Sequence, residues 1–123
     1  MRGKSVMIII RTVSERKRLM VNSEIEQICN RLQTVIMPKQ IYLFGSFAKD
    51  KQTEESDYDF YLVVSDDAGD QIAIIQKAYK SLRGIRKRPV DILVGYESAF
   101  QRRSGEETLE KTVKKEGILL YEQ

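Results

Sequence analysis

The chain has 123 residues, of which 41% are hydrophobic and 32% charged, and its formal net charge is +3. This length predicts one domain, and the composition is typical of a globular protein. The sequence contains no histidine and a single cysteine, Cys29. Histidine-dependent catalysis, histidine-ligated zinc, internal disulfides and cysteine metal clusters are therefore excluded.

A chain with one thiol suits a reducing compartment, so we expect a cytoplasmic protein. The apolar run Val6–Ile10 near the N-terminus is too short for a signal-peptide core or a membrane-spanning helix. We therefore expect no membrane association. Residues 1–22 are expected to form a basic N-terminal extension, and residues 23–123 the folded domain.

The charges are segregated along the chain. Residues 49–70 contain eight acids against Lys49 and Lys51, whereas residues 77–103 contain eight bases against Asp91 and Glu97. An acidic segment folded beside basic ones could hold cations and a polyanion together. A solvated surface of mixed charge is the alternative interpretation.

The first part of the domain predicts a helix followed by a strand. Ser23 and Glu26 form a capping-box pattern, and apolar residues then recur at helical spacing as far as Ile36. We expect a helix over 23–36 that ends near Pro38, with Cys29 buried and inert on its apolar face. Gln40–Phe44 predicts a short strand, and a helical turn is expected over 46–51.

The rest of the chain alternates strands and helices. After a polar loop at 52–56, the expected elements are a strand at Tyr58–Val64, a helix at Asp70–Leu82, a strand at Pro89–Val94, a loop with a helical turn at 95–104, a helix at Glu106–Lys115 ended by Gly117, and a strand at Ile118–Tyr121. The order predicts an α/β fold, a small mixed sheet with flanking helices.

Three aspartates stand at the start of, or within, apolar strand patterns. Asp57 and Asp59 are two residues apart, so on a strand they project from the same face. Asp91 lies in the apolar run Val90–Val94, where an unpaired charge is unfavourable. Carboxylates that converge repel one another unless a cation lies between them, and oxygen ligands of this kind suit magnesium. If the two strands are neighbours, the three carboxylates could hold two magnesium ions.

Gly45 and Ser46 follow directly after the predicted strand at 40–44. A glycine there lets the backbone approach a ligand closely, and a helical turn beginning at Ser46 would present free N–H groups to an anion. Ser56, Lys49, Lys51 and the basic run Arg86–Arg88 could add hydrogen bonds and positive charge around a triphosphate. Taken singly, Gly-Ser, Asp-x-Asp and a lone strand aspartate are each more often structural, whereas their combination in this order is rarely accidental.

The combination resembles the DNA polymerase β-type nucleotidyltransferase superfamily. The resemblance rests on Gly45-Ser46, Asp57-Tyr58-Asp59 eleven positions after Ser46, and Asp91 in a Val-Asp-Ile-Leu-Val strand. The short length and the ending Gly117–Glu122 resemble its minimal nucleotidyltransferase branch. In such enzymes the residues matching Asp57, Asp59 and Asp91 are catalytic and hold two Mg²⁺ ions. The residue matching Asp91 also draws the proton from the acceptor hydroxyl, and those matching Gly45 and Ser46 grip the nucleotide phosphates.

The resemblance also implies a reaction and a partner. A nucleoside monophosphate, commonly AMP from ATP, would be transferred to a hydroxyl acceptor. Minimal members often work beside a helical HEPN-domain protein, and some act as antitoxins by adding AMP to a tyrosine of that partner. The chain departs from the family pattern at Phe47, where an arginine is common, and at Asp50, where a glycine is common. An acidic Asp50 facing the phosphates would weaken nucleotide binding.

Two alternatives stay open. One is an antitoxin that neutralises its partner by contact alone, and the other is an enzyme that modifies a small molecule such as an aminoglycoside. The second needs an additional substrate-binding domain, for which little chain remains after residue 94. Nucleic acid is disfavoured as the acceptor because no RNA-binding module follows, and the sequence leaves self-association open.

Overall fold

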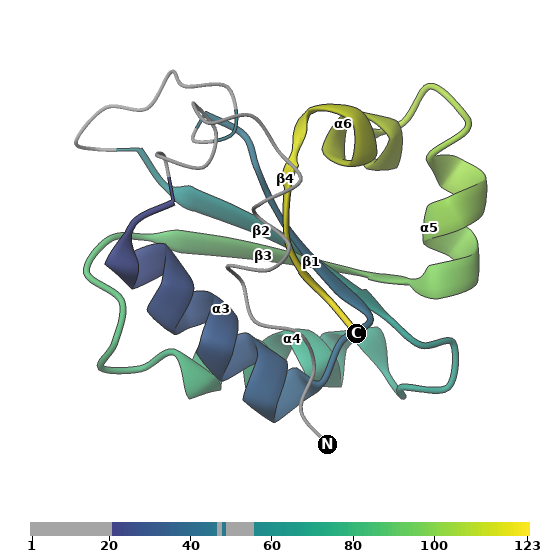
Figure 1. Ribbon diagram of the computed structural model, residues 1–123. Helices are drawn as coiled ribbons and strands as arrows, with labels where there is room; N and C mark the ends of the chain where they lie inside the picture. Colours follow the sequence, from purple (N-terminus) through teal and green to yellow (C-terminus); the bar gives the residue numbers. More distant parts are fainter. Residues whose placement is uncertain (1–20, 47, 49–55) are drawn as a thin grey trace.

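The computed structural model describes residues 21–46, 48 and 56–123, and Figure 1 shows their arrangement. The elements in chain order are α3 (Ser23–Ile36), β1 (Gln40–Phe44), β2 (Tyr58–Val64), α4 (Gln71–Ser81), β3 (Val90–Tyr96), α5 (Glu97–Arg103), α6 (Leu109–Glu116) and β4 (Ile118–Glu122). Three expected segments lie wholly or partly outside the described residues: residues 1–20 of the extension, residues 47 and 49–51 of the turn, and residues 52–55 of the polar loop.

The four strands form one mixed sheet in the order β3-β2-β1-β4. β1 pairs antiparallel with both β2 and β4, whereas β2 and β3 pair in parallel and are connected through α4. The predicted α/β class, with a small mixed sheet and flanking helices, is confirmed. None of the described helices is long and apolar enough to cross a membrane.

Strand alternation divides the core into two layers. Phe60 and Leu62 of β2 join the larger cluster, which α3 and α4 cover with residues such as Ile28 and Ala78. Tyr61 and Val63 point to the opposite face and pack with Phe100 of α5 and Val113 of α6. Figure 1 shows these two helix pairs on opposite faces of the sheet. The α5/α6 face is the one that matters for the site.

The start of α3 differs in detail from the predicted capping box. Asn22, not Ser23, is the N-cap residue, and its Oδ1 accepts a hydrogen bond from the N–H of Ile25 at 2.8 Å. Ser23 is instead the first helical residue. Cys29 is completely buried on α3, and burial raises the pKa of its thiol to about 12, consistent with the inert thiol predicted.

The segment at 95–104 is more regular than expected. Instead of a loop with one turn, residues 97–103 form the helix α5. Its residue Phe100 is 2% exposed and packs its ring against Tyr42 and Tyr61, at centroid distances of 5.6 and 5.2 Å. These aromatic contacts come from distant strands and stabilise a helix that local periodicity does not predict. α6 begins at Leu109, later than expected, because Thr108 caps it.

The exposed edge of β3 is closed by side chains of α4. Tyr79 Oη accepts a hydrogen bond from the N–H of Ile92 at 2.9 Å, and Gln71 Nε2 donates to the carbonyl of Val94. An edge strand otherwise offers free backbone groups to another chain. These two contacts satisfy backbone groups at the edge next to Asp91 and help to hold β3 in place.

We expect Tyr79→Phe to lower the free energy of unfolding by about 1 kcal/mol, because it keeps the ring but leaves the Ile92 N–H without its acceptor. Urea unfolding followed by circular dichroism measures the change. Ile72→Ser on the same helix is the control, because Ile72 is 64% exposed and its loss should change stability by less than about 0.5 kcal/mol. Equal stability of the two variants would contradict the assigned role of Tyr79.

Candidate active site

Asp59 and Asp91 are direct neighbours in the parallel β2–β3 ladder. Their chain neighbours Phe60 and Ile92 are buried in the α3/α4 cluster. Strand alternation therefore directs both aspartates to the other face of the sheet, the face that carries α5 and α6. The structure thus brings together two of the three acids that the sequence singled out, one from each strand.

The charges around Asp59 are crowded. Partial burial, followed by the nearby carboxylates of Asp91 and Asp57 and a hydrogen bond with Asp91, raises the pKa of Asp59 from 3.8 to about 6. Asp57 precedes β2 by one residue and is half-buried, whereas Asp91 is exposed. Asp57 and Asp91 are therefore each close enough to repel the charge of Asp59, and a cation among them would relieve that repulsion.

Gly45 makes room for this cluster. It follows β1 directly, and β1 places Phe44 opposite Asp59 in the antiparallel ladder. The φ of Gly45 is +74°, and a Cβ at this position would collide with Oδ2 of Asp59. Only glycine combines this backbone conformation with such a close approach. The sequence suggested that Gly45 admits a ligand, whereas the structure shows that it admits the Asp59 carboxylate.

Ser46 lies beside Gly45 in a turn that is closed by a hydrogen bond from the N–H of Ala48 to the carbonyl of Gly45, 3.1 Å long. Ser46 is half-buried there. Lys49, predicted to contact nucleotide, and the two departures Phe47 and Asp50 lie outside the described residues. The structure therefore places the Gly-Ser pair at the carboxylates but does not place the lysine.

Tyr58, which sequence reasoning did not assign to the site, anchors the start of β2. Its hydroxyl donates to Glu24 Oε1 at 2.7 Å and accepts from Asn22 Nδ2 at 3.2 Å. Its N–H donates to the carbonyl of Pro89 at 3.0 Å, which ties β2 to the entry of β3. Tyr58 is 1% exposed and lies between Asp57 and Asp59 in sequence. It is a positioning residue for both acids.

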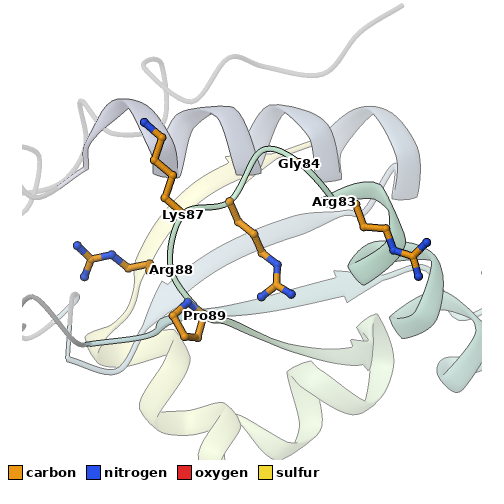
Figure 2. A pocket seen from close by; sticks show the side chains of 6 residues that line it. Arg83, Gly84, Lys87, Arg88 and Pro89 are labelled. Carbon is orange, nitrogen blue, oxygen red and sulfur yellow. The ribbon is translucent and has the colours of Figure 1, made fainter.

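Of the basic run Arg86–Arg88, Arg88 borders the acids. Its Nη1 donates to the carbonyl of Ser56 at 3.1 Å, and its guanidinium lies 5.1 Å from the centroid of the Tyr58 ring. In Figure 2 the side chain of Lys87 leaves the loop in a different direction from that of Arg88. The side chains of Lys87 and Arg88 therefore do not act at one place, although the sequence suggested that Arg86–Arg88 would act together.

The donor set fits a hard divalent cation such as magnesium. It consists of carboxylate oxygens, and Mg²⁺ prefers oxygen ligands. No group of three or more histidine, cysteine, aspartate or glutamate side chains among the described residues has the arrangement of a formed metal site. Mg²⁺ usually binds one or two carboxylates and completes its coordination with water and substrate phosphates. The close pair Asp59 and Asp91 meets this requirement without a closed cage.

The acids also lie on an accessible part of the sheet. The aromatic and aliphatic cluster beneath α5 and α6 covers Tyr61 and Val63, further along β2. At the other end of the same face Asp91 is exposed, and Leu93, two residues along β3, is 39% exposed. A substrate can therefore reach the carboxylates directly.

Comparisons with known proteins agree with this geometry. The family model described as "Polymerase beta, Nucleotidyltransferase" matches residues 23–123. A candidate nucleotidyltransferase from Sulfolobus solfataricus has a similar fold, with a TM-score of 0.59 and 20% identity over 99% of this chain and 91% of that one.

A toxin-antitoxin structure with AMP-PNP matches 83% of this chain and 75% of its own, with a TM-score of 0.47 and 21% identity. A search of curated proteins returned no significant match. The family match spans all four strands and includes Gly45, Asp57, Asp59 and Asp91. The chain belongs to the polymerase β-type nucleotidyltransferase family.

Proposed function

We propose that this protein is a Mg²⁺-dependent nucleotidyltransferase that transfers AMP from ATP to a hydroxyl group. The observation that carries the proposal is the pairing of Asp59 with Asp91 across two parallel strands, on an accessible face and beside Gly45. Paired carboxylates with this crowding are costly to hold in a fold unless they serve a cation. Family membership supplies the reaction class.

The proposed reaction is an in-line displacement. The acceptor oxygen forms a bond to the α-phosphorus of ATP, the bond from that phosphorus to the bridging oxygen breaks, and pyrophosphate leaves. Asp57, Asp59 and Asp91 would hold two Mg²⁺ ions, which when bound would neutralise charge on the phosphates and activate the acceptor. The family resemblance assigns the proton of the incoming hydroxyl to the carboxylate of Asp91, which is exposed and so within reach of an acceptor. Gly45, Ser46 and Ser56 orient the phosphates.

We further propose that the acceptor is a tyrosine of a HEPN-domain partner and that the protein acts as its antitoxin. The basis is the sequence resemblance to the minimal branch of the family. The site suits a large acceptor, because Asp91 is exposed and Asp57 and Asp59 are each only partly buried. Neutralisation by contact alone and transfer to an aminoglycoside are the competing functions, and the first experiment below distinguishes all three.

The first experiment follows label from α-labelled ATP, with Mg²⁺, to the protein encoded beside this chain and, in a parallel arm, to an aminoglycoside. We expect label on the protein. Asp57→Ala or Asp59→Ala should lower the rate about a thousandfold, since several kcal/mol of charge stabilisation are lost. Asp91→Asn should lower turnover about 100-fold or more with little change in ATP binding. Glu106→Ala, an exposed acid elsewhere, is the control.

Two results would contradict the proposal. Label on the aminoglycoside alone would assign a small-molecule acceptor. Equal neutralisation of the partner by the wild type and by the Asp57→Ala/Asp59→Ala variant would assign contact alone.

Gly45→Ala tests whether the room beside Asp59 matters. We expect a loss of activity of about 100-fold, because the new methyl group would collide with the Asp59 carboxylate and push it out of its position. Gly69→Ala is the matched control, since Gly69 also has positive φ, +110°, but a Cβ there meets nothing within 4 Å. The control should lose only stability, about 1–2 kcal/mol. Comparable activity of the two variants would show that Gly45 serves only the turn.

The titration of Asp59 predicts a pH-dependent stability. Its raised pKa of about 6 means that the folded state holds the proton more tightly than the unfolded state, where the ordinary value is 3.8. In EDTA, the stability contributed by this proton is full below pH 3.8 and is lost as the pH rises through about 6.

Thermal unfolding in EDTA between pH 4 and pH 7.5 measures this effect. The melting temperature of the wild type should fall as the pH rises through about 6. Asp59→Asn should remove the part of this fall that is due to Asp59 and raise the melting temperature at pH 7.5, whereas Glu106→Gln should follow the wild type. Mg²⁺ should then stabilise the wild type at pH 7.5 more than Asp59→Asn. A wild type and an Asp59→Asn variant with parallel curves would contradict the crowding of charge at Asp59.

A further inference from the structure

A surface outside the carboxylate site carries an unbalanced positive charge. Residues 71–90 contain six bases and no acid. Five of these bases are exposed and form what we call the basic strip: Lys77, Lys80, Arg83, Arg86 and Lys87. The first three recur at intervals of three residues from α4 into the following turn, a spacing that makes helix side chains neighbours.

Within the part of the chain that the structure describes, the side chains of the basic strip are not paired with acids, although the Glu24 carboxylate accepts a hydrogen bond from the backbone N–H of Lys87. Among the described residues, none of its five side chains forms an ion pair. Arg83, Arg86 and Lys87 line an open pocket of about 430 Å³ together with Arg88 and Pro89. Figure 2 shows the side chains of Arg83 and Lys87 leaving opposite ends of this loop. Cations that spread out in this way suit an extended anionic surface better than one compact anion.

The apolar neighbour of the strip favours a protein over a nucleic acid. Ile72 is 64% exposed on α4, and Ile72, Gln76 and Lys80 follow at intervals of four residues, all exposed. They therefore share one helix face. An exposed isoleucine on the helix that also carries Lys77 and Lys80 matches the combination of apolar and charged residues in a protein interface. Sequence-tolerant binding to single-stranded nucleic acid instead uses exposed aromatic rings, and residues 71–90 contain only Tyr79, whose hydroxyl is bonded to Ile92.

The strip begins on α4, which covers the sheet face opposite the carboxylates, and its loop end reaches the strand that carries Asp91. Its loop continues directly into β3, and the carbonyl of Pro89 accepts the hydrogen bond from Tyr58 N–H, one residue from both Asp57 and Asp59. We propose that the basic strip and Ile72 form the docking surface for an acidic, partly apolar face of the protein that carries the acceptor hydroxyl. This inference rests on the proposed function and adds the chemistry by which the acceptor is recognised.

The test measures binding by fluorescence anisotropy in EDTA without ATP. One probe is a labelled helical peptide of about 20 residues, with glutamates on one face and leucines on the other, and the second is a single-stranded RNA of the same length. We expect the wild type to bind the peptide more tightly than the RNA. The variant Lys80→Glu/Arg83→Glu/Lys87→Glu should bind the peptide about tenfold more weakly.

Two further variants make the result specific. The control Arg102→Glu/Lys114→Glu/Lys115→Glu carries the same charge change on exposed residues of α5 and α6, and it should bind the peptide as the wild type does. Ile72→Ser should weaken binding of the peptide but leave binding of the RNA unchanged. Tighter binding of RNA than peptide, no peptide binding, or equal loss in the two charge-reversal variants would each overturn the proposal.

The outcome is independent of catalysis, because the assay contains neither ATP nor magnesium. If the chain shows no transferase activity but still binds the peptide through the strip, the proposed function is contradicted and the proposed docking surface stands. An active transferase whose strip variant binds the peptide and labels its acceptor as the wild type does would overturn only the docking surface.

Discussion

The parallel pairing of β2 with β3 is the constraint on which the site depends. Asp59 and Asp91 are 32 positions apart in sequence, and only this ladder makes them neighbours. Because side chains alternate along a strand, a slip of one residue in β3 would turn Asp91 to the α3/α4 face and bury its charge. The register that buries Phe60 and Ile92 therefore also places both acids on the accessible face. The same pattern of apolar residues specifies both the core and the site.

Contacts on both sides of this pair hold the register. Tyr58 connects the start of β2 to α3 and to Pro89, and α4 closes the outer edge of β3 through Tyr79 and Gln71. Gly45 leaves room for Asp59 on the side of β1. These positioning residues keep mutually repelling carboxylates in place before any ligand arrives, which is the arrangement that electrostatic catalysis needs. The repulsion destabilises the metal-free fold, and it is the feature that a cation would relieve.

Much of this arrangement could be predicted from local patterns. Continuous apolar runs predicted β1 and β2, and helical spacing predicted α3 and α4. Asp57 and Asp59 stood out as acids two residues apart at the start of an apolar strand, and Asp91 stood out because it interrupts an apolar run. What could not be predicted depends on contacts between distant residues. α5 is stabilised by aromatic rings from β1 and β2, the role of Gly45 requires the Asp59 side chain to lie against it, and Tyr58 becomes an anchor only when Glu24 and Asn22 are folded against it. The separation of Arg88 from Lys87 likewise depends on loop geometry. The roles assigned to the acids, Ser46, Ser56 and Lys49 stay predictions.

The central claim is that the three aspartates gather divalent cations when nucleotide is bound. The most direct measurement is a crystal structure with Mn²⁺ and a non-hydrolysable ATP analogue, with anomalous scattering used to locate the metal. We expect Mn²⁺ bound to carboxylate oxygens of Asp57, Asp59 and Asp91 and to the phosphates, with the phosphates against Gly45 and Ser46. Nucleotide bound with no anomalous signal at these aspartates, or with metal bound elsewhere on the chain, would contradict it.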